Sequence, residues 1–185
     1  YPELAIYKYH EVLLKMELDG MVIWKRGSYT LSGVYIKISK VLMEQGKMKE
    51  SLKVASEITN NYNKSRAYAE ISKVLMEQGK MKESQEAMKE SLRVASEIAG
   101  SRNKSNAYMG ISKVLMEQGK LKESLKVASE ITNDYSKSYA YREISKVLME
   151  QGKMKESLKV ASEISDDYDK SIAYREISKL LMEQE

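Results

Sequence analysis

Ile111-Ser-Lys-Val-Leu-Met-Glu-Gln-Gly119 is one of four copies of the same nine-residue sequence in this chain, and a fifth copy is incomplete. The other copies start at Ile38, Ile71, Ile144 and Ile177. Their spacing is 33 residues, except for one interval of 40. Self-similarity at such a period is typical of solenoids, in which each unit buries its apolar face only against its neighbours. We therefore expect a repeat array whose function lies on a long surface.

The first half of each unit has the pattern of an amphipathic helix. In the unit that spans residues 105–137, apolar side chains recur at intervals of three and four, at Ala107, Tyr108, Ile111, Val114 and Leu115. This is the stripe that one face of an α-helix buries. Gly119 follows at the place where a residue with left-handed backbone ends a helix. The pattern predicts a helix that stops at this glycine.

The second half of the unit predicts another helix, over about residues 121–131. Its apolar residues again recur every three or four positions, at Leu121, Leu125, Ala128 and Ile131. Since only a short turn separates the two helices, they are expected to be antiparallel. The polar connector, residues 133–138, leads to the next unit, and both Asn133 and Ser138 are candidates to cap the following helix.

Composition excludes several classes of function. The 185 residues include no Cys and one His, His10, so neither a thiolate or multi-histidine metal site nor a Ser-His pair is expected in the repeats. The net charge of +4 arises from 31 basic and 27 acidic residues, a balance too even for a concentrated positive field. No apolar run approaches the roughly 18 residues that span a bilayer. We expect no catalysis, no metal and no cofactor, and favour a cytoplasmic location, although any signal upstream of Tyr1 lies outside the sequence.

The unit resembles the tetratricopeptide repeat (TPR), a helix-turn-helix motif of 34 residues. The family's Trp, Leu, Gly, Tyr, Ala, Phe and Pro fall here on Tyr108, Ile111, Ser112, Leu115, Ser124, Ala128 and Ser136. Size agrees at most of these places, but the unit is one residue shorter and lacks the proline. The chain is thus similar to a divergent, TPR-like array. The resemblance implies an all-α fold, a right-handed α-α superhelix, or solenoid, of helix-turn-helix repeats.

The period divides the chain into a short N-terminal segment and an array. Residues 1–31 lack the repeat and are expected to form a helix and an irregular segment that cap the first unit. The array, residues 32–185, consists of units 32–64, 65–104, 105–137 and 138–170, followed by a half unit, 171–185, that acts as a C-terminal cap.

The unit 65–104 contains seven extra residues, visible as a near-duplication of Met81-Lys-Glu-Ser84 in Met88-Lys-Glu-Ser91. Seven residues make about 1.94 helical turns, so the second helix should lengthen by about two turns while its face shifts by only about 20°. The insertion is interpreted either as tolerated slippage during duplication or as a ledge that docks a partner.

The units differ mainly on one face of the first helix. Positions 2, 5 and 6, counted from the Ser that opens each unit, vary between copies, whereas most positions around them are fixed. The three are spaced i, i+3, i+4 and therefore share a helical face, which in the TPR family lines the concave groove. Two explanations of this variation remain open: the positions are specialised to bind a ligand in a groove, or they drift because they are exposed and packing does not constrain them. The candidate groove residues are Arg66, Lys73, Asn106, Met109, Lys113, Met116, Tyr139, Arg142, Lys146, Met149, Arg175 and Lys179.

Two fixed rows run beside the varied positions. The lysines at position 9 each precede a glutamate by four residues, as Lys73 precedes Glu77, which is the spacing of an ordinary ion pair on a helix surface. The methionines at position 12 suit an adaptable apolar contact with a ligand, and equally suit packing within the array.

The function expected from this face is a protein-protein interaction scaffold that binds an extended or helical peptide segment. Arg142 and Arg175 indicate an acidic-apolar peptide, with Met116 and Met149 under its apolar side chains, unless nearby glutamates such as Glu143 neutralise the arginines. A monomer is expected, with end-to-end association as the alternative.

The alternative function is RNA binding by repeats of the pentatricopeptide type, which read one base per unit. That code requires small polar residues at one repeated position near the start of the first helix. Position 5 instead holds Ile36, Ala69, Met109, Arg142 and Arg175. Nucleic acid is therefore the less favoured partner.

Overall fold

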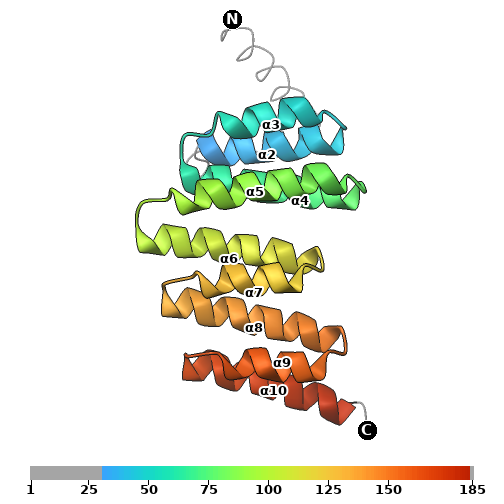
Figure 1. Cartoon of the computed structure of the whole chain (residues 1–185), viewed down its shortest axis with the longest axis vertical. Helices are drawn as coiled ribbons and strands as arrows, with labels where there is room; N and C mark the ends of the chain where they lie inside the picture. Colours follow the sequence, from blue (N-terminus) through green and yellow to red (C-terminus); the bar gives the residue numbers. More distant parts are fainter. Residues whose placement is uncertain (1–30, 184–185) are drawn as a thin grey trace, which may run out of the picture.

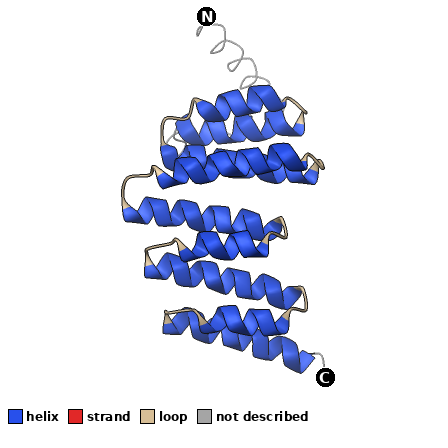
Figure 2. Ribbon diagram, viewed as in Figure 1, coloured by secondary structure: helices blue, strands red, loops and turns tan. Residues whose placement is uncertain are grey.

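A computed structural model of the chain describes residues 31–183, and within this range every regular element is a helix (Figure 2). In chain order the helices are α2 (Leu31–Glu44), α3 (Met48–Ser56), α4 (Asn61–Glu77), α5 (Met81–Ser96), α6 (Ser101–Glu117), α7 (Leu121–Ser129), α8 (Asp134–Glu150), α9 (Met154–Ser162) and α10 (Asp167–Glu183). The predicted N-terminal helix and capping segment, with His10, fall on residues outside this range.

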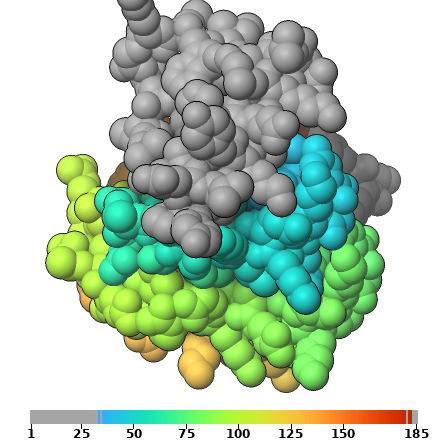
Figure 3. Space-filling view, turned by 90° about the horizontal axis from the view of Figure 1, so that it is seen from above, coloured from blue at the N-terminus to red at the C-terminus, as the bar shows by residue number. Residues whose placement is uncertain are grey.

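The helices are stacked in antiparallel pairs along one axis (Figure 1). The helices that open the units, α2, α4, α6, α8 and α10, pack on one another in that order. Each of α3, α5, α7 and α9 packs against the opening helix before it and the one after it. In a view along the axis the later units lie behind the earlier ones (Figure 3). The described part of the chain is therefore the all-α solenoid that the repeat predicts.

Glycine ends four of the opening helices, as the sequence predicts. Gly46, Gly79, Gly119 and Gly152 have φ angles of 75°, 73°, 72° and 73°. This left-handed backbone is the one that glycine adopts without a steric penalty. It lets the amide of Lys120 donate a hydrogen bond back to the carbonyl of Leu115, at 2.9 Å, which closes the end of α6.

The next opening helix begins at an asparagine. The side-chain oxygen of Asn133 accepts the backbone N–H of Ser136 at 2.9 Å and so caps α8. The other candidate, Ser138, is buried, and its hydroxyl accepts the N–H of Asp166 at 3.1 Å in the following connector. Asn133 is therefore the cap, and Ser138 ties its unit to the next one.

A pair of serines joins the two helices of each complete unit. In the third unit the hydroxyls of Ser112 and Ser124 lie 3.0 Å apart, and the Ser124 hydroxyl donates to the backbone carbonyl of Ser112 at 2.8 Å. Both residues are buried, at 1% and 0% exposed. Because serine is small and carries its own donor, the two backbones lie close together without an unpaired polar group.

Helix α5 has 16 residues, whereas α3, α7 and α9 have nine. It runs without a break through residues 85–88, so the predicted two-turn extension of this helix is confirmed. The longer helix makes a second serine contact with α4, because the hydroxyl of Ser91 donates to the carbonyl of Ser65 at 2.8 Å. Both ends of this helix pair are thus held by serines.

Candidate functional site

Two adjoining cavities lie between α6 and α8, on the face where the units differ. One, of about 200 Å³, is lined by apolar groups of Met109, Met116, Tyr139, Ala140 and Ile144, among others. The second, of about 420 Å³, is lined by Arg102, Asn106, Met109, Asn133, Tyr135, Ser136 and Tyr139. Because they share Met109 and Tyr139, the cavities form one depression, called here the α6–α8 groove.

The residues at positions 5 and 6 of this junction differ from those of the next one, where both are charged. Gly110 stands at position 6, where the next unit has Glu143. Met109 stands at position 5, where the next unit has Arg142. At that next junction Arg142 spans the two opening helices by pairing with Asp169 of α10. The α6–α8 junction has no such bridge at these places, and both cavities border Met109.

Arg142 is held by groups of the chain itself. Its guanidinium bonds to the carboxylate of Asp169 and lies 3.5 Å from that of Glu143. It also stacks over the ring of Tyr139, with 4.8 Å to the ring centroid. The charge of Arg142 is thus neutralised by neighbouring acids. Of these, the sequence indicated Glu143 but not Asp169.

The fixed lysines differ in their partners. Lys73 does not pair with Glu77 but bonds across the unit boundary to Glu117 of α6, at 2.7 Å. This hydrogen bond raises the pKa of Lys73 above its ordinary value. Lys113 and Lys146 are exposed and have no ion-pair partner within residues 31–183. One lysine of the row, Lys73, therefore joins two units, whereas Lys113 and Lys146 are available to a ligand.

The methionine row belongs mostly to the core. Met43, Met116 and Met149 are only 0%, 5% and 8% exposed, whereas Met182 in the last unit is 69% exposed. Met149 packs in a cluster of buried apolar side chains beneath α10. Met116 is buried too, but one side of it borders the groove. Packing within the array therefore accounts for the three buried methionines, and a broad row of exposed methionines is absent from α2, α6 and α8.

Five of the candidate residues line the α6–α8 groove, namely Asn106, Met109, Lys113, Met116 and Tyr139. The side-chain oxygen of Asn106 accepts the hydroxyl of Ser136 at 3.3 Å. Arg66 lies one junction away, exposed, with its guanidinium 6.0 Å from the ring centroid of Tyr62. Arg175 and Lys179 belong to α10 at the far end of the array.

Sequence reasoning missed several residues that border the groove. Gly110 stands at the varied position 6, but it has no side chain that a pattern of contact residues could indicate. Arg102 lies in the first turn of α6, in the stretch Gly100-Ser-Arg102 that replaces the Asn/Asp-Tyr of the other units. Tyr135, 69% exposed, lies in the first turn of α8, before the positions whose variation the sequence pattern singles out. The first turns of α6 and α8 thus contribute to the groove together with the divergent helical face.

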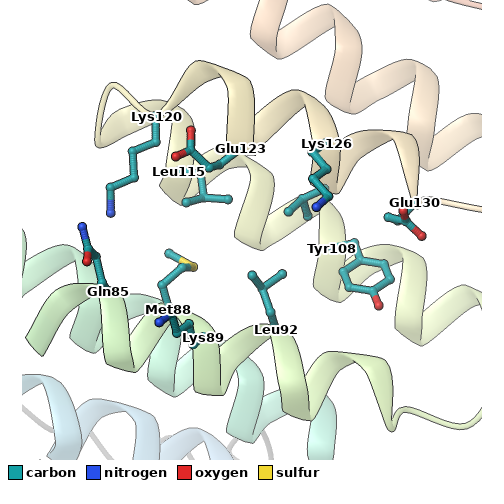
Figure 4. Close-up of a pocket in the computed structure, with 11 residues that line it drawn as sticks. Gln85, Met88, Lys89, Leu92, Tyr108, Leu115, Lys120, Glu123, Lys126 and Glu130 are labelled. Atoms are coloured by element: carbon teal, nitrogen blue, oxygen red, sulfur yellow. The ribbon is translucent and has the colours of Figure 1, made fainter. Parts of the chain in front are cut away.

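A larger cleft, of about 500 Å³, lies on the side of the shorter helices, between α5 and α7 (Figure 4). Met88 and Leu92 extend into it from α5, and Leu115 forms part of its floor. Its rim carries both signs of charge, on Lys89, Lys120, Glu123, Lys126 and Glu130. Such a balanced rim gives little indication of a ligand's charge. In the α6–α8 groove, by contrast, the only acid, Glu143, lies beside Arg142, whereas Arg102 and Lys113 have no acidic partner within the described residues.

Comparison with known proteins agrees with this architecture. The sequence profile of the family described as tetratricopeptide repeat matches residues 65–98, the unit that contains α4 and α5. The chain is a TPR-like helical repeat protein. TPR-like arrays generally mediate protein-protein interactions and are typically non-catalytic.

Among solved structures, the TPR-like array is similar to a crystal structure of nearly identical TPR-like repeats from a Podospora anserina protein named for kinesin light chain. The identity is 10% over 80% of this chain and 84% of that chain, with a TM-score of 0.45. None of the curated proteins matches the chain. In the part described by the structure, no helix is long and apolar enough to cross a membrane.

Proposed function

We propose that this TPR-like array is an interaction scaffold that binds a peptide segment, extended or helical, in the α6–α8 groove. The observation that carries the proposal is that the groove coincides with the face on which the units diverge. The isoleucine at position 7 is buried in every unit, whichever residues stand at positions 2, 5 and 6. Packing of the array alone therefore does not require Met109, Gly110 and Tyr139.

The lining of the groove suits a peptide. Met109 and the ring of Tyr139 offer adaptable apolar and aromatic surface to a side chain. Asn106 and Asn133 carry amide groups that both donate and accept hydrogen bonds, which is what the main chain of a bound segment needs. A groove with apolar walls and a few polar groups is typical of sites that fix the orientation of a ligand.

The experiment is selection of binders from a random-peptide display library with the full chain, followed by titration of a selected peptide by fluorescence anisotropy. We expect Met109→Ala and Tyr139→Ala each to weaken binding by about tenfold or more, as central contacts of an interface do. Lys122→Ala and Lys155→Ala, at exposed sites on α7 and α9, are the matched controls and should leave the affinity unchanged. Selected peptides that bind all four variants equally would contradict the proposal.

A further inference from the structure

Gly110 lies in the interior of α6, where glycine lowers helix stability relative to other residues. Nothing in the backbone requires glycine there, because Gly110 is absent from the glycines with positive φ. Crowding does not require it either, since a Cβ at this position would meet no atom within 4 Å apart from its chain neighbours and the adjacent backbone of α6. The missing side chain therefore has neither a conformational nor a packing explanation.

The same position carries a long charged side chain in each of the other units, namely Lys37, Glu70, Glu143 and Glu176. Gly110 borders the 200 Å³ cavity between Met116 of its own helix and Ile144 of α8. A glutamate at position 110 would start from the wall of this cavity and place a carboxylate in or over it. The absence of a side chain thus keeps an apolar cavity open at the centre of the divergent face.

The charges beside this cavity are unbalanced. Lys113, one turn along α6, borders the same cavity and has no acidic partner in the described part of the chain. Arg102 borders the adjoining cavity and likewise has none within residues 31–183. Glu143, which lines the cavity, is shared with Arg142. A ligand that complements this site presents an apolar group together with a carboxylate.

We propose that Gly110 determines specificity by opening a socket for one large aliphatic or aromatic side chain of an acidic peptide, and that Lys113 pairs with a carboxylate next to that side chain. This inference rests on the function proposed above and adds the chemistry of the ligand. The carboxylate of the peptide then pairs with Lys113 rather than with Arg142, which is already paired within the chain.

The test uses a synthetic peptide array in which Leu or Trp is flanked by Glu, with matched sets that carry Lys for Glu or Ala for the large residue. The wild-type chain should prefer the acidic, large-residue set. Gly110→Glu should weaken binding to this set by about tenfold or more and raise the melting temperature, because glutamate is the better helix former. Lys113→Glu should shift the preference toward the basic set.

Two controls separate binding from stability. Glu70→Gly makes the reverse change at the same position of α4 and should lower the melting temperature without changing binding. Gly110→Ala should raise the melting temperature and reduce binding less than Gly110→Glu does. If Gly110→Glu binds as tightly as the wild type while Tyr139→Ala does not, the socket is overturned and the proposed groove survives. If both variants bind as tightly as the wild type, both proposals fail.

Discussion

Arg142 of α8 and Asp169 of α10 form an ion pair across the junction between the fourth and fifth units, with 2.5 Å between guanidinium and carboxylate. The Asp169 side chain is 3% exposed and that of Arg142 is 18% exposed. The second oxygen of the Asp169 carboxylate is buried and has no hydrogen-bond partner in the described part of the chain. One unit earlier the same two places hold Met109 and Ser136. The array therefore carries an ion pair across one junction and uncharged side chains at the equivalent places of the junction before it.

This equivalence predicts a non-additive pair of substitutions. Arg142→Met leaves the buried Asp169 carboxylate without its cation and should cost about 2–3 kcal/mol, and Asp169→Ser should cost less because Arg142 is partly exposed. The double variant copies the native pair Met109 and Ser136 and should recover most of the loss. Urea unfolding of the two single variants and the double variant measures the coupling. A double variant as unstable as the sum of the single variants would show that the pair is not interchangeable.

The serine pairs predict a second stability series. Ser112→Ala removes a buried hydroxyl that meets Ser124, and we expect a loss of about 1 kcal/mol. Ser112→Leu should be worse by about 1–3 kcal/mol, because the larger side chain forces α6 and α7 apart. Ser129→Ala is the control, since its exposed hydroxyl bonds only to the carbonyl of Lys126 and should change stability by less than about 0.5 kcal/mol. If Ser112→Leu has the same melting temperature as Ser129→Ala, Ser112 is not needed for the close contact between α6 and α7.

We expect deletions within the long helix α5 to be tolerated only if they keep the apolar face of the helix in place. Removing residues 81–87 joins Lys80 to Met88 and recreates the sequence Gly-Lys-Met-Lys-Glu-Ser of the first and fourth units. Since seven residues shift the helical face by only about 20°, this variant should fold with a shorter helix. Removing residues 82–86 turns the following face by about 140° and should prevent cooperative folding. Circular dichroism melts of both variants test this, and equal stability of the two would refute the phase argument.

The repeat predicted the helices, their glycine ends and the length of α5, because these depend on spacing within one unit. The groove was predicted less completely because it depends on what two units place opposite each other. Lys73 pairs with Glu117 in the next unit rather than with Glu77 four residues on. Arg142 likewise finds Asp169, 27 residues away at the start of α10, outside the helical face that the sequence pattern singles out. Contacts between units follow from the pitch of the stack, which the period alone does not specify.

We expect the chain to lose stability in alkaline solution because of three tyrosines at position 4, namely Tyr68, Tyr108 and Tyr141. Burial is the main cause that raises the pKa of each phenol, with nearby glutamates adding to it. The folded chain therefore favours the neutral phenol. This contribution is fully present below the unfolded pKa of about 10 and is lost as the pH rises through the higher folded values.

Replacing all three tyrosines with phenylalanine should flatten the fall in stability above pH of about 10, because no phenol is left to ionise at these sites. Lys73 complicates the measurement, since its raised pKa also makes stability fall as the pH rises through its folded value. Lys73→Met is therefore the parallel control, and it should leave the tyrosine contribution in place. Urea unfolding at a series of alkaline pH values separates the two contributions. If the phenylalanine variant loses stability in parallel with the wild type, these three phenols do not limit the stability of the array at high pH.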